Sequence, residues 1–154
     1  MNQCKCIVVS GKSNVGKTAS INQLFNKLID AGYKVDGPHF YGEKRESNDR
    51  WAIFTINGKK LGIASRGDGA LGVISSLTKL VGCDYFISAS HLYGDSIDEY
   101  LKESTEWGKH PTFKLNEMVI LNKPGSGDDE KTQVLDNQAF ADYLYQICFK
   151  LFNL

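Results

Sequence analysis

The sequence predicts a three-layer α/β domain built on a mainly parallel sheet that carries an antiparallel β-hairpin strand. Strand-like apolar runs alternate with segments in which apolar residues recur at helical spacing, a pattern typical of this class. The run Cys4–Ser10 and the helical pattern that follows from Lys17 form the first such unit. Asn57-Gly58, between two further strand-like runs, predicts the hairpin. No linker, repeat or low-complexity tract interrupts the sequence, so we expect a single domain over residues 1–154.

The first half of the chain predicts one buried strand, one helix and the hairpin. Cys4–Ser10 is a short, β-branched apolar run, suited to a strand buried on both faces. The helix is indicated by apolar residues at helical spacing: Ile21, Leu24, Phe25, Leu28 and Ile29. Gly32 is a common C-terminal cap for such a helix. The polar stretch Asp36–Asp49 predicts a long loop, and Trp51–Ile56 and Lys60–Ser65 are the two strands of the hairpin.

The second half predicts two more strands among three helices. Asp84–Ser90 predicts one strand, and Met118–Leu121 predicts another, whose start is either Met118 or as early as Thr112. Ser96 with Glu99 forms a capping box that opens a helix. The helix before them is indicated by Leu71, Ile74, Leu77 and Val81. The helix at the end of the sequence is indicated by Phe140, Tyr143, Leu144, Ile147 and Leu151. Pro124–Thr132 is polar, acidic and glycine-rich, and predicts a loop.

Composition and charge exclude several classes of protein. Hydrophobic residues make up 42% and charged residues 23% of the sequence, and 18 basic residues balance 18 acidic ones. Without net positive charge, we expect neither nucleic acid nor a membrane surface as a partner. No run approaches the roughly 18 apolar residues of a membrane span, and the sequence opens without a signal-peptide pattern, so we expect a cytoplasmic protein. The cysteines fit this compartment as buried free thiols: Cys4, Cys6, Cys83 and Cys148.

One segment predicts a binding chemistry. Residues 11–18 read GKSNVGKT and match the GxxxxGK[ST] pattern of a phosphate-binding P-loop, between a buried strand and an amphipathic helix. Glycines let the backbone wrap closely around phosphate, and the loop N–H groups lie at the positive end of the helix dipole. Lys17 can reach the β and γ phosphates, and the Thr18 hydroxyl can join a magnesium shell. The predicted site for a nucleoside triphosphate and Mg²⁺ comprises Gly11, Ser13, Asn14, Val15, Gly16, Lys17 and Thr18.

With this motif, the chain resembles P-loop NTPases over nearly its whole length. More narrowly, it is similar to a poorly characterised group of small bacterial and phage P-loop proteins. The matching features are GKSNVGKT, a hairpin ending in IASRGDG, and the run CDYFISASH. The resemblance implies the P-loop NTPase fold and its nucleotide site, and it implies no particular reaction.

Further candidates follow from the rule that ligands bind beyond the carboxyl ends of parallel strands in open α/β sheets. Asp68 follows the apparent strand LGIAS, so we predict that it holds Mg²⁺ through a water in a Walker-B-like role. The alternative is an aspartate in a tight Gly-Asp-Gly turn. Arg66 lies in the same turn, where it either pairs with a transferred phosphoryl group or second substrate, or is a solvated surface arginine.

Two later strand ends supply the remaining candidates. His91 follows DYFISAS, where it either contacts substrate or orients a water, or is a structural histidine. Asn122 and Lys123 follow MVIL and resemble the start of the guanine-reading NKxD motif of GTPases. However, Gly125 replaces the aspartate that accepts from guanine. This loop therefore either contacts the base without selecting guanine or is only an exit turn.

Three functions fit these residues. We favour a P-loop kinase or NTPase that uses Mg²⁺ and ATP to transfer phosphoryl to a small acceptor or to water, with Lys17, Asp68, Arg66 and His91 as catalytic residues. The alternative is a nucleotide-dependent switch that regulates a protein partner, with Asp36–Asp49 as its switch region and GTP still open as the nucleotide. A static binder that keeps the nucleotide as a structural ligand is the third interpretation.

Overall fold

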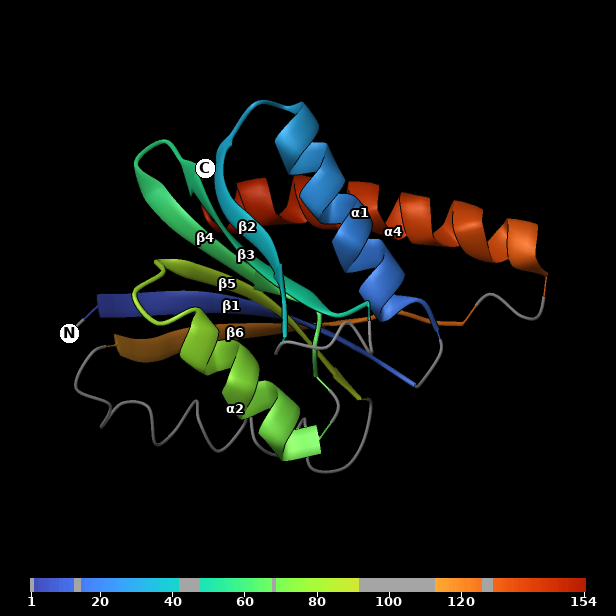
Figure 1. Ribbon diagram of the computed structural model, residues 1–154, viewed down its shortest axis with the longest axis horizontal. Helices are drawn as coiled ribbons and strands as arrows, with labels where there is room; N and C mark the ends of the chain where they lie inside the picture. Colours follow the sequence, from blue (N-terminus) through green and yellow to red (C-terminus); the bar gives the residue numbers. More distant parts are fainter. Residues whose placement is uncertain (1, 13–14, 42–47, 68, 92–112, 126–128) are drawn as a thin grey trace.

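The computed structural model describes residues 2–12, 15–41, 48–67, 69–91, 113–125 and 129–154. These residues form a six-stranded mixed sheet and three helices, which confirms the predicted α/β class (Figure 1). The strands are β1 (Asn2–Gly11), β2 (Lys34–Phe40), β3 (Arg50–Ile56), β4 (Lys59–Ala64), β5 (Tyr85–His91) and β6 (Phe113–Asn122), and the helices are α1 (Lys17–Asp30), α2 (Gly69–Lys79) and α4 (Glu130–Leu151). The predicted helix that would open at Ser96 lies outside the described residues.

The sheet brings several strand ends to one edge. The strand order is β2-β3-β4-β5-β1-β6, in which β4, β5, β1 and β6 run parallel and β3 is antiparallel to both β2 and β4. Gly11 of β1 pairs with His91 of β5, and Ser10 pairs with Asn122 of β6. The carboxyl ends of these three strands therefore meet, at the right of the sheet in Figure 1. This is the edge where open α/β sheets bind ligands.

Strand β1 is buried on both faces, as its continuous apolar run predicted. Ile7 and Val9 belong to a hydrophobic cluster on one face of the sheet, whereas Cys6 and Val8 belong to a cluster on the other. This alternation follows from the two-residue period of a strand. Because packing fixes β1 from both sides, it also fixes the start of the segment that leaves its carboxyl end.

Helices cover both faces of the sheet (Figure 1). α1 and α4 pack side by side on one face, where Leu24 and Phe25 of α1 share a cluster with Leu144 and Cys148 of α4. α2 lies on the opposite face and contributes Leu77 to the second cluster. The apolar residues of α1 and α4 recur three and four positions apart, so each helix turns one stripe toward the sheet.

The predicted hairpin is confirmed. Asn57 and Gly58 join β3 to β4 with φ angles of 50° and 76°. Both values lie in the left-handed region that a two-residue type I′ turn requires, which asparagine and glycine tolerate best. The hairpin supplies the antiparallel part of the sheet.

The predicted loop Asp36–Asp49 is wrong at its start. Residues up to Phe40 belong to β2, an edge strand that pairs antiparallel with β3. Gly37 and Pro38 fall where the register of this pairing is irregular, so the missing proline N–H leaves no gap in the ladder. Their Gly-Pro sequence and the polar neighbours gave this strand the appearance of a turn.

Three of the cysteines are buried, as predicted. Cys83 and Cys148 are free thiols, and Cys6 is also buried within the core. Burial raises the pKa of the Cys83 and Cys148 thiols to about 12. Both therefore stay protonated and unreactive at neutral pH.

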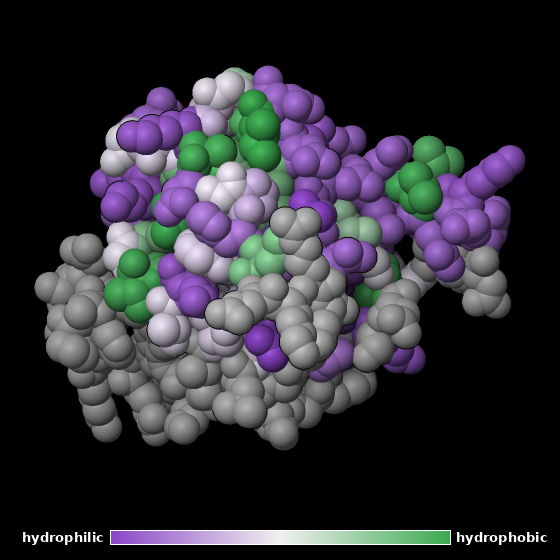
Figure 2. Space-filling model, viewed as in Figure 1, coloured by the Kyte–Doolittle hydropathy of each residue, from purple (hydrophilic) through white to green (hydrophobic). Residues whose placement is uncertain are grey.

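The outer surface of α1 and α4 is largely hydrophilic, with a few apolar groups between polar ones (Figure 2). The large apolar side chains that α4 exposes are Val134, Leu135, Tyr143 and Leu151. Leu135 is the most exposed of them, at 64%. Within the described part of the chain, no helix has the length and apolar character needed to cross a membrane.

Candidate functional site

The segment that matches the P-loop pattern leaves β1 and enters α1. Gly11 is the last residue of β1, and Lys17 and Thr18 are the first residues of α1, so the strand and helix predicted on either side are confirmed. Ser13 and Asn14 lie outside the described residues. We refer to the stretch Gly11–Thr18 as the anion loop, after the phosphate ligand that its sequence predicts.

Two glycines of the anion loop stand where a side chain would not fit. A Cβ atom on Gly11 would lie 2.8 Å from the carbonyl oxygen of Lys123 and 2.9 Å from Cγ2 of Val15. Gly16 has a φ of 91°, and a Cβ atom there would overlap the side-chain amide of Asn137 in α4. Gly11 therefore requires glycine because the Lys123 backbone approaches too closely, and Gly16 requires it because side chains rarely adopt its positive φ.

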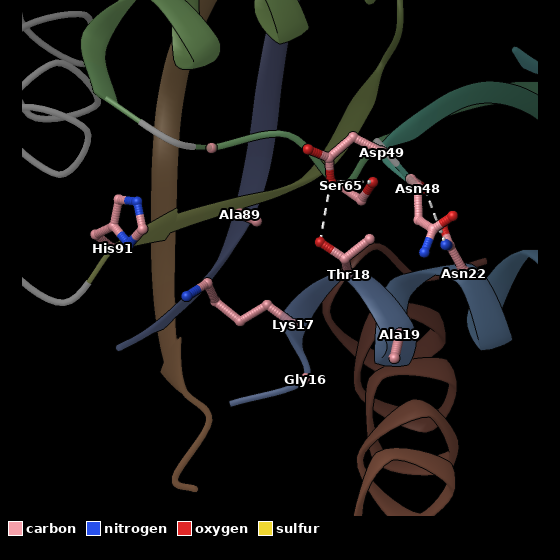
Figure 3. Close-up of a pocket in the computed structure, with 11 residues that line it drawn as sticks. Gly16, Lys17, Thr18, Ala19, Asn22, Asn48, Asp49, Ser65, Ala89 and His91 are labelled. Atoms are coloured by element: carbon pink, nitrogen blue, oxygen red, sulfur yellow. Dashed lines mark hydrogen bonds between the residues drawn. The ribbon is translucent and has the colours of Figure 1, made fainter. Parts of the chain in front are cut away.

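Lys17 closes the anion loop on itself. Its ammonium group donates hydrogen bonds of 2.7 Å to the carbonyl oxygens of Gly11 and Lys12, back at the start of the loop. In Figure 3 the side chain runs from α1 toward the end of β1. Burial, and then the nearby charge of Lys123, lower the pKa of Lys17. An anion bound beside Lys17 would offset both effects.

Lys123 supports the loop from β6. Its side chain is only 2% exposed, and its ammonium group donates a 2.6 Å hydrogen bond to the carbonyl oxygen of Val15 and lies 5.7 Å from the centre of the Phe140 ring. Burial lowers the pKa of Lys123, and the charge of Asp136 opposes this effect. Asn122, its predicted companion, is exposed at the end of β6.

The two long helices begin differently. α4 begins at Glu130, inside the stretch 124–132 predicted as a loop, because the Asp129 carboxylate accepts a 3.1 Å hydrogen bond from the N–H of Lys131 and caps the helix. α1 begins after Gly16, without a side-chain cap and without an acidic residue in its first turn. The start of a helix carries partial positive charge, so the N-terminus of α1 suits an anion.

A cavity of about 600 Å³ opens beside the start of α1 (Figure 3). Its volume lies in the range of small-molecule sites. The walls come from α1, the segment before β3, and the ends of β4 and β5: Gly16, Lys17, Thr18, Ala19, Asn22, Asn48, Asp49, Ser65, Gly67, Ala89 and His91. The cavity therefore joins the anion loop to the edge where the strands end.

Asp49 contacts Thr18 in this cavity, and the sequence had not singled it out. The Thr18 hydroxyl donates a 2.9 Å hydrogen bond to Oδ1 of Asp49, and the Ser65 hydroxyl donates to the same oxygen at 3.1 Å (Figure 3). Asn22 of α1 donates a 3.1 Å hydrogen bond to the carbonyl oxygen of Asn48. Two consecutive residues are thus tied to the first turns of α1.

The direction of β3 explains why Asp49 was overlooked. Because β3 is antiparallel to β4, its first residue Arg50 lies beside Ser65, with hydrogen bonds of 2.9 Å from Arg50 N to Ser65 Oγ and 3.0 Å from Ser65 N to Arg50 O. The start of β3 therefore shares an edge with the ends of the parallel strands. The rule about strand ends would have identified Asp49 had it also been applied to the beginning of an antiparallel strand.

The other predicted residues differ in whether they line the cavity. His91 lines it. The Arg66 side chain lies against Tyr41, with 5.6 Å between the guanidinium carbon and the ring centre, and Arg66 is not among the lining residues. Asp68 lies outside the described residues, so its predicted role stays a prediction.

Comparison of the chain with models of protein families, with curated proteins and with solved structures gives no match.

Proposed function

We propose that the chain is a P-loop protein that binds a nucleoside triphosphate together with Mg²⁺ and passes its terminal phosphoryl group to a small acceptor or to water. The observation that carries this proposal is the closure of the anion loop by Lys17 beside the cavity. The proposal includes the three-layer P-loop NTPase fold. Helices on both faces of a partly parallel sheet support that assignment.

The charges around the anion loop favour a polyanion. Lys17 and Lys123 both approach the loop backbone, and burial disfavours the charged form of each. Phosphate oxygens would supply the opposite charge, and the uncapped N-terminus of α1 would add its dipole. Lys17 can exchange its bonds with the Gly11 and Lys12 carbonyls for bonds with phosphate.

Magnesium fits the residues present. Among the described residues, no three His, Cys, Asp or Glu side chains gather into a metal site. Mg²⁺ in phosphoryl-transfer proteins does not need such a cage, because phosphate oxygens and water supply most of its ligands. The Thr18 hydroxyl donates a hydrogen bond to Asp49, so the lone pairs of the Thr18 oxygen stay available for the metal. When bound, the ion would neutralise charge on the β and γ phosphates.

The loop after β6 supports ATP over GTP. Gly125 stands where the guanine-reading motif has its aspartate. Lys123 is buried and bonded to the Val15 carbonyl. At position 125 the chain therefore has no carboxylate that could accept hydrogen bonds from guanine.

The tie between residues 48–49 and α1 favours the switch as a second candidate function. Asn48 and Asp49 directly follow the stretch 42–47 and are bonded to Asn22 and Thr18. A ligand that changes the Thr18–Asp49 contact would also shift the residues that precede Asn48 in the chain. On this candidate, nucleotide exchange alters the protection of residues 36–49 from protease, whereas a kinase accelerates its turnover when an acceptor is added.

The test is calorimetric titration of the protein with ATP and with GTP, each with Mg²⁺ and with EDTA. We expect ATP to bind more tightly with Mg²⁺ present. Lys17→Ala should weaken this binding by about 10-fold to 100-fold, since charge-assisted hydrogen bonds contribute roughly 1.5–3 kcal/mol.

Lys59→Ala is the matched control, because Lys59 is an exposed lysine at the start of β4, at the other end of that strand from the cavity. It should bind ATP as the wild type does. Equal affinity of the Lys17→Ala variant and the wild type would contradict the proposal. Preference for GTP would move the switch ahead of the kinase.

A further inference from the structure

Asp49 is placed to determine whether the site accepts a metal-bound or a metal-free nucleotide. We propose that Asp49 is the carboxylate that positions the Thr18 hydroxyl for Mg²⁺ and makes nucleotide binding depend on the metal. This inference rests on the proposed function. It assigns the acidic role to the residue before an antiparallel strand, whereas the sequence had suggested Asp68.

The hydrogen bonds around Asp49 fix the direction of the Thr18 hydroxyl. Oδ1 of Asp49 accepts from Thr18 at 2.9 Å and from Ser65 at 3.1 Å. The Ser65 hydroxyl in turn accepts from the backbone N–H of Arg50 at 2.9 Å. This chain of donors holds the carboxylate in place, so the Thr18 proton points toward Asp49 and its oxygen lone pairs point elsewhere.

The negative charge of Asp49 also affects which form of the nucleotide binds. Its carboxylate lines the same cavity as Lys17, within a hydrogen bond of the first turn of α1. A triphosphate bound at the anion loop without metal would be repelled by this charge, whereas a bound Mg²⁺ would be attracted by it. Asp49 therefore disfavours the free nucleotide and favours its magnesium complex.

Two opposite changes in affinity test this role. In titrations with whichever triphosphate the wild type binds, Asp49→Asn should reduce the affinity gain that Mg²⁺ provides by about 10-fold to 100-fold, the range for residues that orient a metal ligand. The same variant should bind the nucleotide in EDTA at least as tightly as the wild type, because the repelling charge is gone. A purely structural role would weaken both measurements.

Two matched variants complete the experiment. Ser65→Ala removes one donor to Asp49 and keeps the charge, so we expect a smaller loss of the magnesium gain and unchanged binding in EDTA. This variant also serves if Asp49→Asn fails to fold. Asp30→Asn removes an exposed carboxylate at the other end of α1 from Thr18 and should leave the magnesium gain unchanged.

Several results would overturn the inference. An unchanged magnesium gain in Asp49→Asn, weaker binding in EDTA, or an equal loss of the gain in Asp30→Asn would each exclude the role of Asp49 while leaving the proposed function standing. Failure of the wild type to bind either triphosphate would remove the proposed function and this inference with it.

Discussion

Two lysine ammonium groups share the space around one short loop. Lys17 bonds to the Gly11 and Lys12 carbonyls, and Lys123 bonds to the Val15 carbonyl. Carbonyl dipoles satisfy both charges, yet burial still lowers both pKa values, and the charge of Lys123 further lowers that of Lys17. The pair is therefore a strained arrangement of like charges that a bound anion would relieve.

This arrangement predicts a pH dependence of stability. A lysine whose pKa is lower in the folded than in the unfolded state binds fewer protons when folded, so the free energy of unfolding rises with pH. The rise should occur just below the ordinary lysine pKa of 10.5, above the lowered folded values. In Lys123→Met the rise should be smaller, because one buried amine and its repulsion on Lys17 are gone. Urea unfolding across this alkaline window measures the slope.

Lys12→Met is the control for this experiment, since Lys12 is an exposed lysine of the same loop. Its slope should match that of the wild type. Equal slopes in all three proteins would show that the folded state does not destabilise the charged lysines.

The sequence identified residues of this site unevenly. Lys17 and Thr18 could be predicted because a fixed spacing places them at a strand–helix junction. Asp49 could not be predicted in this way, because its contact with Thr18 depends on the direction in which β3 enters the sheet. Lys123 was noticed for a possible base contact, whereas its support of the loop depends on burial that no local pattern encodes.

Among the elements, α4 has one side packed in the core and another side exposed to solvent. Leu144 is fully buried in the cluster that α4 shares with α1, whereas Leu135 of the same helix is 64% exposed. Leu144→Ala should reduce the free energy of unfolding by about 2–5 kcal/mol, because it removes buried methyl groups and leaves a cavity. Denaturant titration gives the value.

Leu135→Ala makes the same chemical change at the exposed position. It should alter stability by less than about 0.5 kcal/mol. If both variants lost the same stability, α4 would not be packed on α1 as described here.

Elements were predictable where local chemistry and packing agree. The Asn57-Gly58 turn forms the expected hairpin because its backbone angles are the ones these residues tolerate. β2 was missed because its Gly37-Pro38 pair indicates a turn, and only pairing with β3 makes an edge strand of it. Tertiary contacts therefore determine that residues 34–40 form a strand, whereas the local sequence determines the hairpin turn.

In the whole molecule, β1 lies between β5 and β6 in the sheet, and the anion loop leaves its carboxyl end. The sequence predicted that these segments are strands, but their order depends on which distant segments pair. β1 is early in the chain, and its two partners lie at residues 85–91 and 113–122. The anion loop is thus built on contacts between segments far apart in sequence.

This position predicts the pattern of amide hydrogen exchange. Ile7, Val8 and Val9 of β1 should exchange only through global unfolding, because β1 is paired on both sides and buried on both faces. Amides of β2, at the sheet edge, should exchange through smaller local openings. Native-state exchange followed by mass spectrometry or NMR distinguishes the two, and equal protection of β1 and β2 would contradict this description.

The position of β1 in the sheet also determines when the anion loop gains its supporting contacts during synthesis on the ribosome. The residues GKSNVGKT are synthesised before β5 and β6, and Lys123 follows β6. A nascent chain that ends before Phe113 carries the anion loop without the strand and the lysine that support it. We therefore expect the anion loop to capture a ligand only after β6 and Lys123 have been synthesised, so binding by a growing chain would report that these segments are in place.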